Sequence, residues 1–147
     1  MKSVLQACST LLALMIAITS AVAAGLPQIE VWKDPNCGCC SKWIAHLEQA
    51  GFSVVGHDTA RVSAVREKLG MPQRYGACHT AWVDGYVIEG HVPANDIIRL
   101  LNERPEGTGL AVPGMPAGSP GMEASYSEPY QTLLINGAGK SSVFAEH

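Results

Sequence analysis

The sequence predicts an α/β fold, because segments with the period of a strand alternate with segments with the period of a helix. Residues 28–33, "QIEVWK", alternate apolar and polar side chains as a half-buried strand does. Residues 40–50 then place apolar side chains at helical spacing, and Gly51 follows where a helix would end. The same pair of patterns recurs in residues 52–57, a strand, and residues 61–69, a helix.

A β-hairpin is expected next. Residues 80–83, "TAWV", and residues 86–89, "YVIE", have the composition of short strands. Between them stand Asp84 and Gly85, a dipeptide typical of two-residue hairpin turns.

A closing helix follows in residues 95–103, "NDIIRLLNE", with Asn95 or Asp96 as its expected N-cap. The tail predicts a second hairpin, with strands at residues 130–135 and 142–144. The predicted order is therefore βαβ, a helix, a β-hairpin and a helix, then a Gly/Pro/Met loop and a C-terminal β-hairpin.

This order resembles that of thioredoxin-like and glutaredoxin-like proteins over residues 28–103, with a C-x-x-C motif after the first strand. In those folds a cis-proline before the third strand lies against the C-x-x-C motif. Here "ACHTAWVDG" puts Cys78 and His79 at that place, and no proline. The resemblance thus brings a fourth thiol to the motif and argues against ordinary thiol–disulfide exchange.

The first 24 residues have the pattern of an export signal: Lys2, the apolar run "LLALMIAI", and "AVAA" where a signal peptidase cuts. The run is short for a membrane span, so we expect a periplasmic protein without a stable membrane anchor. Removing Lys2 leaves nine basic and thirteen acidic side chains, a net charge of −4, which excludes a basic surface for nucleic acid. We expect a thioredoxin-like domain in residues 25–104, on which residues 105–147 pack.

Three cysteines crowd into "DPNCGCC", and Cys78 is the fourth outside the leader. Cys37 and Cys40 have the C-x-x-C spacing of a disulfide at a helix N-terminus. Cys39 is then left over, with Cys78 as its candidate partner. The backbone N–H groups and the positive end of the helix dipole favour thiolates at this place.

Four thiols gathered at one helix N-terminus predict a soft metal, because thiolates favour Cu(I), Zn(II) or iron–sulfur clusters. A zinc ion needs four ligands that converge as a tetrahedron, for which a Cys-x-Cys-Cys run is poorly suited. Bridging thiolates in a multinuclear Cu(I) cluster tolerate crowded sulfur atoms better, so copper is the expected metal.

Residues 106–123 are rich in Gly and Pro and show neither a helix nor a strand period, so we expect a functional loop. Its repeated Pro-Gly-Met carries Met115 and Met122, whose thioethers are candidate copper ligands. The alternative is that these methionines pack over apolar surface as gap-fillers. His79 and His91 are further candidate ligands, although a lone histidine more often has a structural role.

Three blocks, "DPNCGCCSKW", "ACHTAWVDGYVIEGHVPA" and "GLAVPGMPAGSPGME", resemble the exported copper-resistance proteins of the CopG type. The resemblance implies a periplasmic protein that binds copper ions and interconverts Cu(I) and Cu(II), with other periplasmic copper-handling proteins as partners. It also implies a copper cluster held by four cysteines, with the Met-rich loop nearby: Cys37, Cys39, Cys40 and Cys78.

Two other classes remain open. A thiol–disulfide oxidoreductase would use Cys37 as nucleophile and Cys40 as resolving thiol. A zinc-binding or purely structural disulfide module would leave Cys39 and the methionines without a use. The sequence favours a metal-binding protein and leaves enzymatic turnover of copper open.

Overall fold

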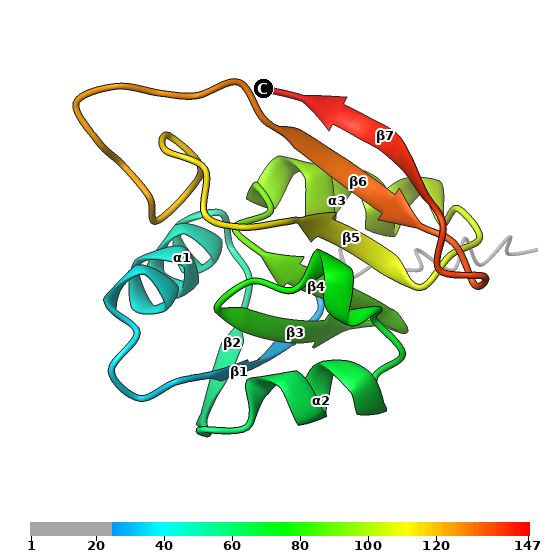
Figure 1. Ribbon diagram of the computed structural model, residues 1–147, viewed down its shortest axis with the longest axis horizontal. Helices are drawn as coiled ribbons and strands as arrows, with labels where there is room; N and C mark the ends of the chain where they lie inside the picture. Colours follow the sequence, from blue (N-terminus) through cyan, green and yellow to red (C-terminus); the bar gives the residue numbers. More distant parts are fainter. Residues whose placement is uncertain (1–24) are drawn as a thin grey trace, which may run out of the picture.

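Seven strands form a single mixed sheet in the computed structural model, which describes residues 25–147 (Figure 1). The predicted export signal lies outside these residues. Within residues 25–147, no helix combines the length and the apolar character that crossing a membrane requires. The elements in chain order are β1 Ile29–Lys33, α1 Gly38–Gln49, β2 Val54–Asp58, α2 Val62–Lys68, the 3₁₀ helix Gln73–Tyr75, β3 His79–Val83, β4 Tyr86–Gly90, α3 Ala94–Glu103, β5 Gly109–Val112, β6 Gln131–Ile135 and β7 Ser141–Glu146.

The strand order in the sheet is β2-β1-β3-β4-β5-β6-β7. β1 and β2 run parallel, as do β4 and β5, and the other neighbouring pairs are antiparallel. In the β3–β4 hairpin Val83 pairs with Tyr86, and the turn residues Asp84 and Gly85 have φ of 44° and 94°. A two-residue turn with positive φ at both positions matches the twist of the strands it joins. The hairpin predicted from Asp84 and Gly85 is confirmed.

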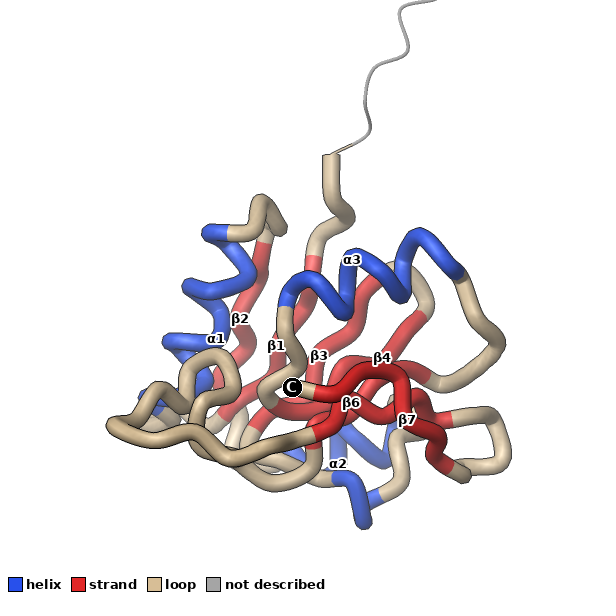
Figure 2. The backbone as a smooth tube through the Cα atoms, turned by 90° about the horizontal axis from the view of Figure 1, so that it is seen from above, coloured by secondary structure: helices blue, strands red, loops and turns tan. Residues whose placement is uncertain are grey.

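α1 and α3 cover one face of the sheet (Figure 2). Trp43 and Leu47 of α1, and Ile97 and Leu100 of α3, are fully buried against strand residues such as Ile88. Burial of an apolar side chain of this size stabilises the fold by roughly 1.5–3 kcal/mol. This face holds α1, and with it the N-terminal cysteines, rigidly against the strands.

α2 and the segment after it cover the opposite face. A smaller apolar cluster there consists of Met71, Tyr75, Val87, Ala111 and Ile135. Beside it, Arg66 of α2 forms a buried ion pair with Glu89 of β4, with 2.8 Å between the guanidinium and carboxylate atoms. The sheet is therefore covered on both sides near its centre.

The predicted loop at residues 106–123 is wrong in part, because Gly109–Val112 forms β5 between β4 and β6. All four residues of β5 are buried, so the strand has no alternation of apolar and polar side chains for a sequence pattern to reveal. A Cβ on Gly109 would clash with the backbone of Val87, so only glycine allows β5 to pair this closely with β4.

The expected capping role of Asn95 or Asp96 is wrong as well. α3 begins at Ala94 after Pro93, and the Ala94 N–H donates to His46 Nε2 at 3.0 Å. Asp96 is buried instead against the C-terminal hairpin, where its carboxylate accepts hydrogen bonds from Thr132 and His147. A tertiary acceptor on α1 thus replaces the local cap.

The remaining elements agree with the predicted order, and the α/β class is confirmed. The strand predicted at residues 52–57 begins two residues later and ends one residue later, as β2. The C-terminal hairpin forms from β6 and β7, which pair antiparallel around the Asn136 turn. Its two strands add to the same sheet as the rest of the chain.

Candidate metal centre

The N-terminus of α1 carries three of the cysteines. The Asn36 N–H donates to Asp34 Oδ1 at 2.8 Å, and the Cys37 N–H donates to the Asp34 carbonyl oxygen at 3.0 Å. This turn makes Cys37 the N-cap and places Cys39 and Cys40 in the first turn of the helix. Cys37 makes no side-chain capping hydrogen bond, and the first turn of α1 holds no acidic residue. The positive end of the helix dipole is therefore available to stabilise thiolates.

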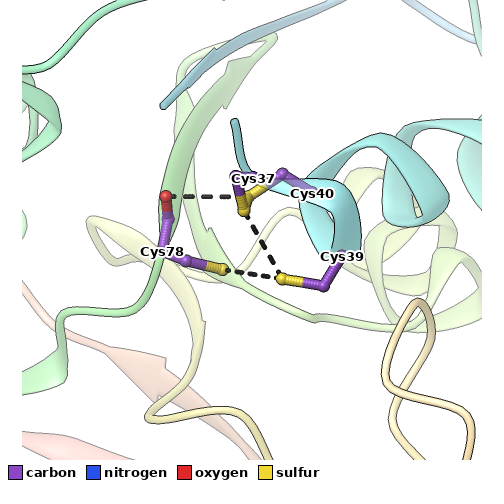
Figure 3. A group of neighbouring side chains, drawn as sticks. All are labelled: Cys37, Cys39, Cys40 and Cys78. Carbon is purple, nitrogen blue, oxygen red and sulfur yellow. Dashed lines mark hydrogen bonds between the residues drawn. A yellow bond between two sulfur atoms is a disulfide. The ribbon is translucent and has the colours of Figure 1, made fainter. Parts of the chain in front are cut away.

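Cys78, immediately before β3, lies against these three residues (Figure 3). Its Sγ is 3.7 Å from Cys39 Sγ, which is 3.4 Å from Cys37 Sγ. The Sγ atoms of all four cysteines lie within 4.8 Å of one another. The chain thus brings together the four thiols that the sequence offers as soft-metal ligands.

Two of the four sulfur atoms are bonded to each other. Cys37 and Cys40 form a disulfide, whereas Cys39 and Cys78 are free thiols. Cys40 is fully buried, and its Sγ is 3.7 Å from the Cys78 carbonyl oxygen. The structure is the oxidised form of the Cys37–Cys40 dithiol, from which a two-electron reduction gives four free thiols.

His91 is oriented toward Cys78 by the Gly/Pro/Met loop that follows β5. Its Nδ1 lies 2.8 Å from the Pro120 carbonyl oxygen, to which only a protonated Nδ1 can donate. Its Nε2 lies 3.2 Å from Cys78 Sγ and is left with a lone pair that faces the thiol. A carbonyl that fixes the tautomer of a histidine in this way is typical of metal-binding histidines.

His79, fully buried, also contacts Cys78. Its Nδ1 is 3.5 Å from Cys78 Sγ, and its ring packs on Trp43 with 4.3 Å between ring centroids. Its Nε2 has no hydrogen-bond partner within residues 25–147. Because Nδ1 is the nitrogen that faces Cys78, a metal bound beside Cys78 would be held by Nδ1, and Nε2 would carry the ring proton.

Burial keeps these side chains neutral. It raises the pKa of the Cys78 thiol to about 12, with the neighbouring Cys39 as a further cause. It lowers the pKa of His79 to about 3, assisted by His91, and it lowers the pKa of His91. Neutral imidazoles offer lone pairs to a metal, whereas Cys78 must release a proton on binding one. Sulfur and imidazole nitrogen donors of this kind fit copper.

Met115 and Met122 border a cavity of about 480 Å³ beside the cysteines. Cys39 and Lys42 of α1 line the same cavity, and Glu123 stands at the loop side. Met115 is 52% exposed, so it is not a core residue. The cavity therefore connects the methionines with Cys39.

The loop that carries the methionines crosses the first turn of α1 at Gly121. A Cβ at this position would lie 2.7 Å from the Cys39 carbonyl oxygen and 2.9 Å from the Trp43 backbone nitrogen. The residue also has a φ of +86°, in the left-handed region. Only glycine lets the loop approach the cysteines this closely.

We expect Gly121→Ala to destabilise the protein by roughly 2–5 kcal/mol, because left-handed backbone strain and a backbone clash add together. Gly114→Ala is the matched control, since Gly114 has a φ of +74° and a Cβ added there would meet nothing within 4 Å beyond its chain neighbours. That control should lose only roughly 1–2 kcal/mol. Urea unfolding of both variants measures the difference, and equal losses would contradict the close approach at Gly121.

Sequence patterns do not indicate two parts of the centre. They predict Trp43 only as a buried helix residue, yet its ring covers His79 and its Nε1–H donates to the Val92 carbonyl oxygen at 2.8 Å. The Pro120 carbonyl that orients His91 is a backbone group, for which residue type gives no signal. Both depend on tertiary contacts between distant segments.

Comparisons with known proteins find a matching family and similar solved structures. A family described as "Protein of unknown function, DUF411" matches residues 75–122, which include Cys78, both histidines and both methionines. Two solved structures are similar over 83% of this chain and 98% of theirs, at 50% sequence identity. They are described as "Copper resistance protein copG", Form 2 with a TM-score of 0.79 and Form 1 with a TM-score of 0.78. No curated protein matches the chain.

Proposed function

This chain belongs to the CopG family of copper resistance proteins, and we propose that it is a periplasmic copper-binding protein. In its reduced form, four cysteines hold a thiolate-bridged, multinuclear Cu(I) cluster. Copper ions are its cargo, which it binds and interconverts between Cu(I) and Cu(II) during copper stress. The ligands of the cluster are Cys37, Cys39, Cys40 and Cys78.

One observation carries this proposal: the four Sγ atoms lie within 4.8 Å of one another. Three of the four come from one Cys-x-Cys-Cys run, in which the adjacent Cys39 and Cys40 leave the helix about 100° apart, so this run is poorly suited to converge on a single zinc ion. Thiolates that bridge several neighbouring Cu(I) ions need not all converge on one point, so they accommodate this run better. Thiolate ligands also select Cu(I) among the metals available to a protein.

The methionines and histidines complete the proposed ligand set. His79 and His91 border Cys78, and Met115 and Met122 border the cavity at Cys39. A thioether binds Cu(I) without losing a proton, so the methionines suit the entry side of the centre. The Gly/Pro/Met loop, which packs on the first turn of α1 at Gly121, would then cover the site.

Export to the periplasm is supported by the signal-like first 24 residues and by the disulfide, which persists in oxidising compartments. The order of elements up to α3 supports a thioredoxin-like fold for residues 25–104. Other periplasmic copper-handling proteins are the proposed partners that deliver or receive the metal.

A second candidate function is a periplasmic thiol–disulfide oxidoreductase. The closed Cys37–Cys40 disulfide at the start of α1 favours it, because redox-active C-x-x-C pairs occupy this position. Such an enzyme requires only Cys37 and Cys40, and gives Cys78 and the two histidines no role. The two functions therefore differ in which residues they need.

An anaerobic Cu(I) titration of the fully reduced protein tests the proposal. We expect more than one copper per chain, with sulfur as the main ligand in X-ray absorption spectra. Cys39→Ser should lower the stoichiometry but leave the Cys37–Cys40 disulfide reducible. Absence of tight copper binding, together with ready turnover of an external disulfide, would favour the oxidoreductase instead.

A further inference from the structure

We propose that the protein has a second, mononuclear copper site that operates while the Cys37–Cys40 disulfide is closed. One copper ion binds there to Cys78, His79 and His91, and Cys39 is not needed. This inference rests on the proposed copper function, because copper is taken as the cargo. It goes further in stating which of the proposed ligands hold copper in the oxidised protein.

The three side chains already converge in the disulfide-closed structure. One ligand atom from each lies within 4.8 Å of the others. His91 Nε2 is 3.2 Å and His79 Nδ1 is 3.5 Å from Cys78 Sγ. None of the three takes part in the disulfide, so closing it removes none of these donors.

Within residues 25–147, His79 Nδ1 and His91 Nε2 have Cys78 Sγ as their only hydrogen-bond partner. Pro120 occupies His91 Nδ1, which leaves Nε2 for the metal side. His79 presents Nδ1 to Cys78, and the His79 and His91 rings meet edge to face with 5.0 Å between their centroids. One thiolate and two imidazoles are a donor set that holds copper in proteins. The arrangement is therefore a metal site and not only a packed core.

The four-cysteine group and this group share only Cys78. Closing the disulfide removes Cys37 and Cys40 from the first group and leaves the second intact. Cu(II) is the oxidant that closes the disulfide. The Cys37 and Cys40 thiols lose two protons and two electrons to form it, and two Cu(II) ions become two Cu(I) ions. One of these Cu(I) ions stays at Cys78, and the other leaves.

The experiment compares Cu(I) binding by the oxidised and the reduced protein under anaerobic conditions. Peptide mapping first verifies that Cys37 and Cys40 are joined and that Cys39 and Cys78 are free. For the oxidised protein we expect one Cu(I) per chain, and an X-ray absorption spectrum with one sulfur and two nitrogen donors. The reduced protein should bind more than one, with sulfur as the main ligand.

Two variants of the oxidised protein identify the ligands. Cys39→Ser should still bind one Cu(I), whereas His91→Gln should lose at least about ten-fold in affinity. His91 is buried, so circular dichroism checks that this variant is folded. The X-ray absorption spectrum of the wild-type protein tests the ligands independently of the variant. The inference is overturned if the oxidised protein binds no copper, binds it through sulfur alone, or loses it in Cys39→Ser. A cluster in the reduced protein would then leave the proposed function standing, and binding by neither form would refute both.

Discussion

Cys78→Ser should abolish tight Cu(I) binding in both the reduced and the disulfide-closed protein. Cys78 is the one residue that both groups of metal donors contain. Its Sγ lies 3.7 Å from Cys39 Sγ and 3.2 Å from His91 Nε2, so its loss separates the thiols from the imidazoles. Loss of a residue that only supports a metal ligand already lowers affinity by about 10- to 100-fold. Loss of this shared ligand should lower it by at least about 100-fold.

Competition with a Cu(I) chelator measures the affinity of each form. Cys39→Ser is the matched control, because it makes the same chemical change at a thiol found in only one of the two groups. We expect Cys39→Ser to weaken only the reduced protein. If Cys78→Ser kept more than one tightly bound copper per chain, Cys78 would not belong to the cluster.

The positions of the cysteines illustrate what the sequence could predict about this centre. Local sequence patterns are enough to predict that three of the cysteines lie at a helix N-terminus, because their short run follows a strand pattern and precedes a helix pattern. Cys78 is 38 residues beyond Cys40, and only the resemblance to a known fold brought it to the same place. Helix and strand periods are local, so they can place a cysteine at the start of a helix. They cannot show that a cysteine far along the chain lies next to that helix.

Glu89 and Asp96 show why the remaining structure could not be predicted. Both are charged residues in elements with an apolar period, and a charged residue in such a pattern indicates a solvent-facing side. In the structure both are buried, because α2 covers the face that carries Glu89 and the C-terminal hairpin covers Asp96. β5 gave no signal for a related reason, since a strand buried on both faces has no alternation. In each case the residue is buried by a segment that lies far away in the sequence, which a local pattern cannot include.

Glu89→Gln should cost about 3–5 kcal/mol of unfolding free energy, because it leaves the buried Arg66 charge without its partner. Glu89 is 0% exposed and Arg66 is 6% exposed. The Glu89 carboxylate also accepts hydrogen bonds from the Ala77 N–H at 2.7 Å and the Thr80 hydroxyl at 2.6 Å. Arg66 in turn donates to the Ala77 carbonyl oxygen at 2.8 Å. The ion pair thus holds both the N–H and the carbonyl group of Ala77, the residue before Cys78.

Urea unfolding measures this loss, and Glu103→Gln provides the control. Glu103 pairs with Arg99 on the exposed side of α3, where losing an i,i+4 ion pair should cost only about 0.3–0.5 kcal/mol. The double variant Arg66→Met with Glu89→Leu should recover part of the loss, because it leaves no unpaired charge in the interior. Since the pair also fixes the backbone at Ala77, the double variant should hold copper more weakly than the wild type even where stability returns. Full recovery of both properties would mean that apolar packing alone positions Cys78.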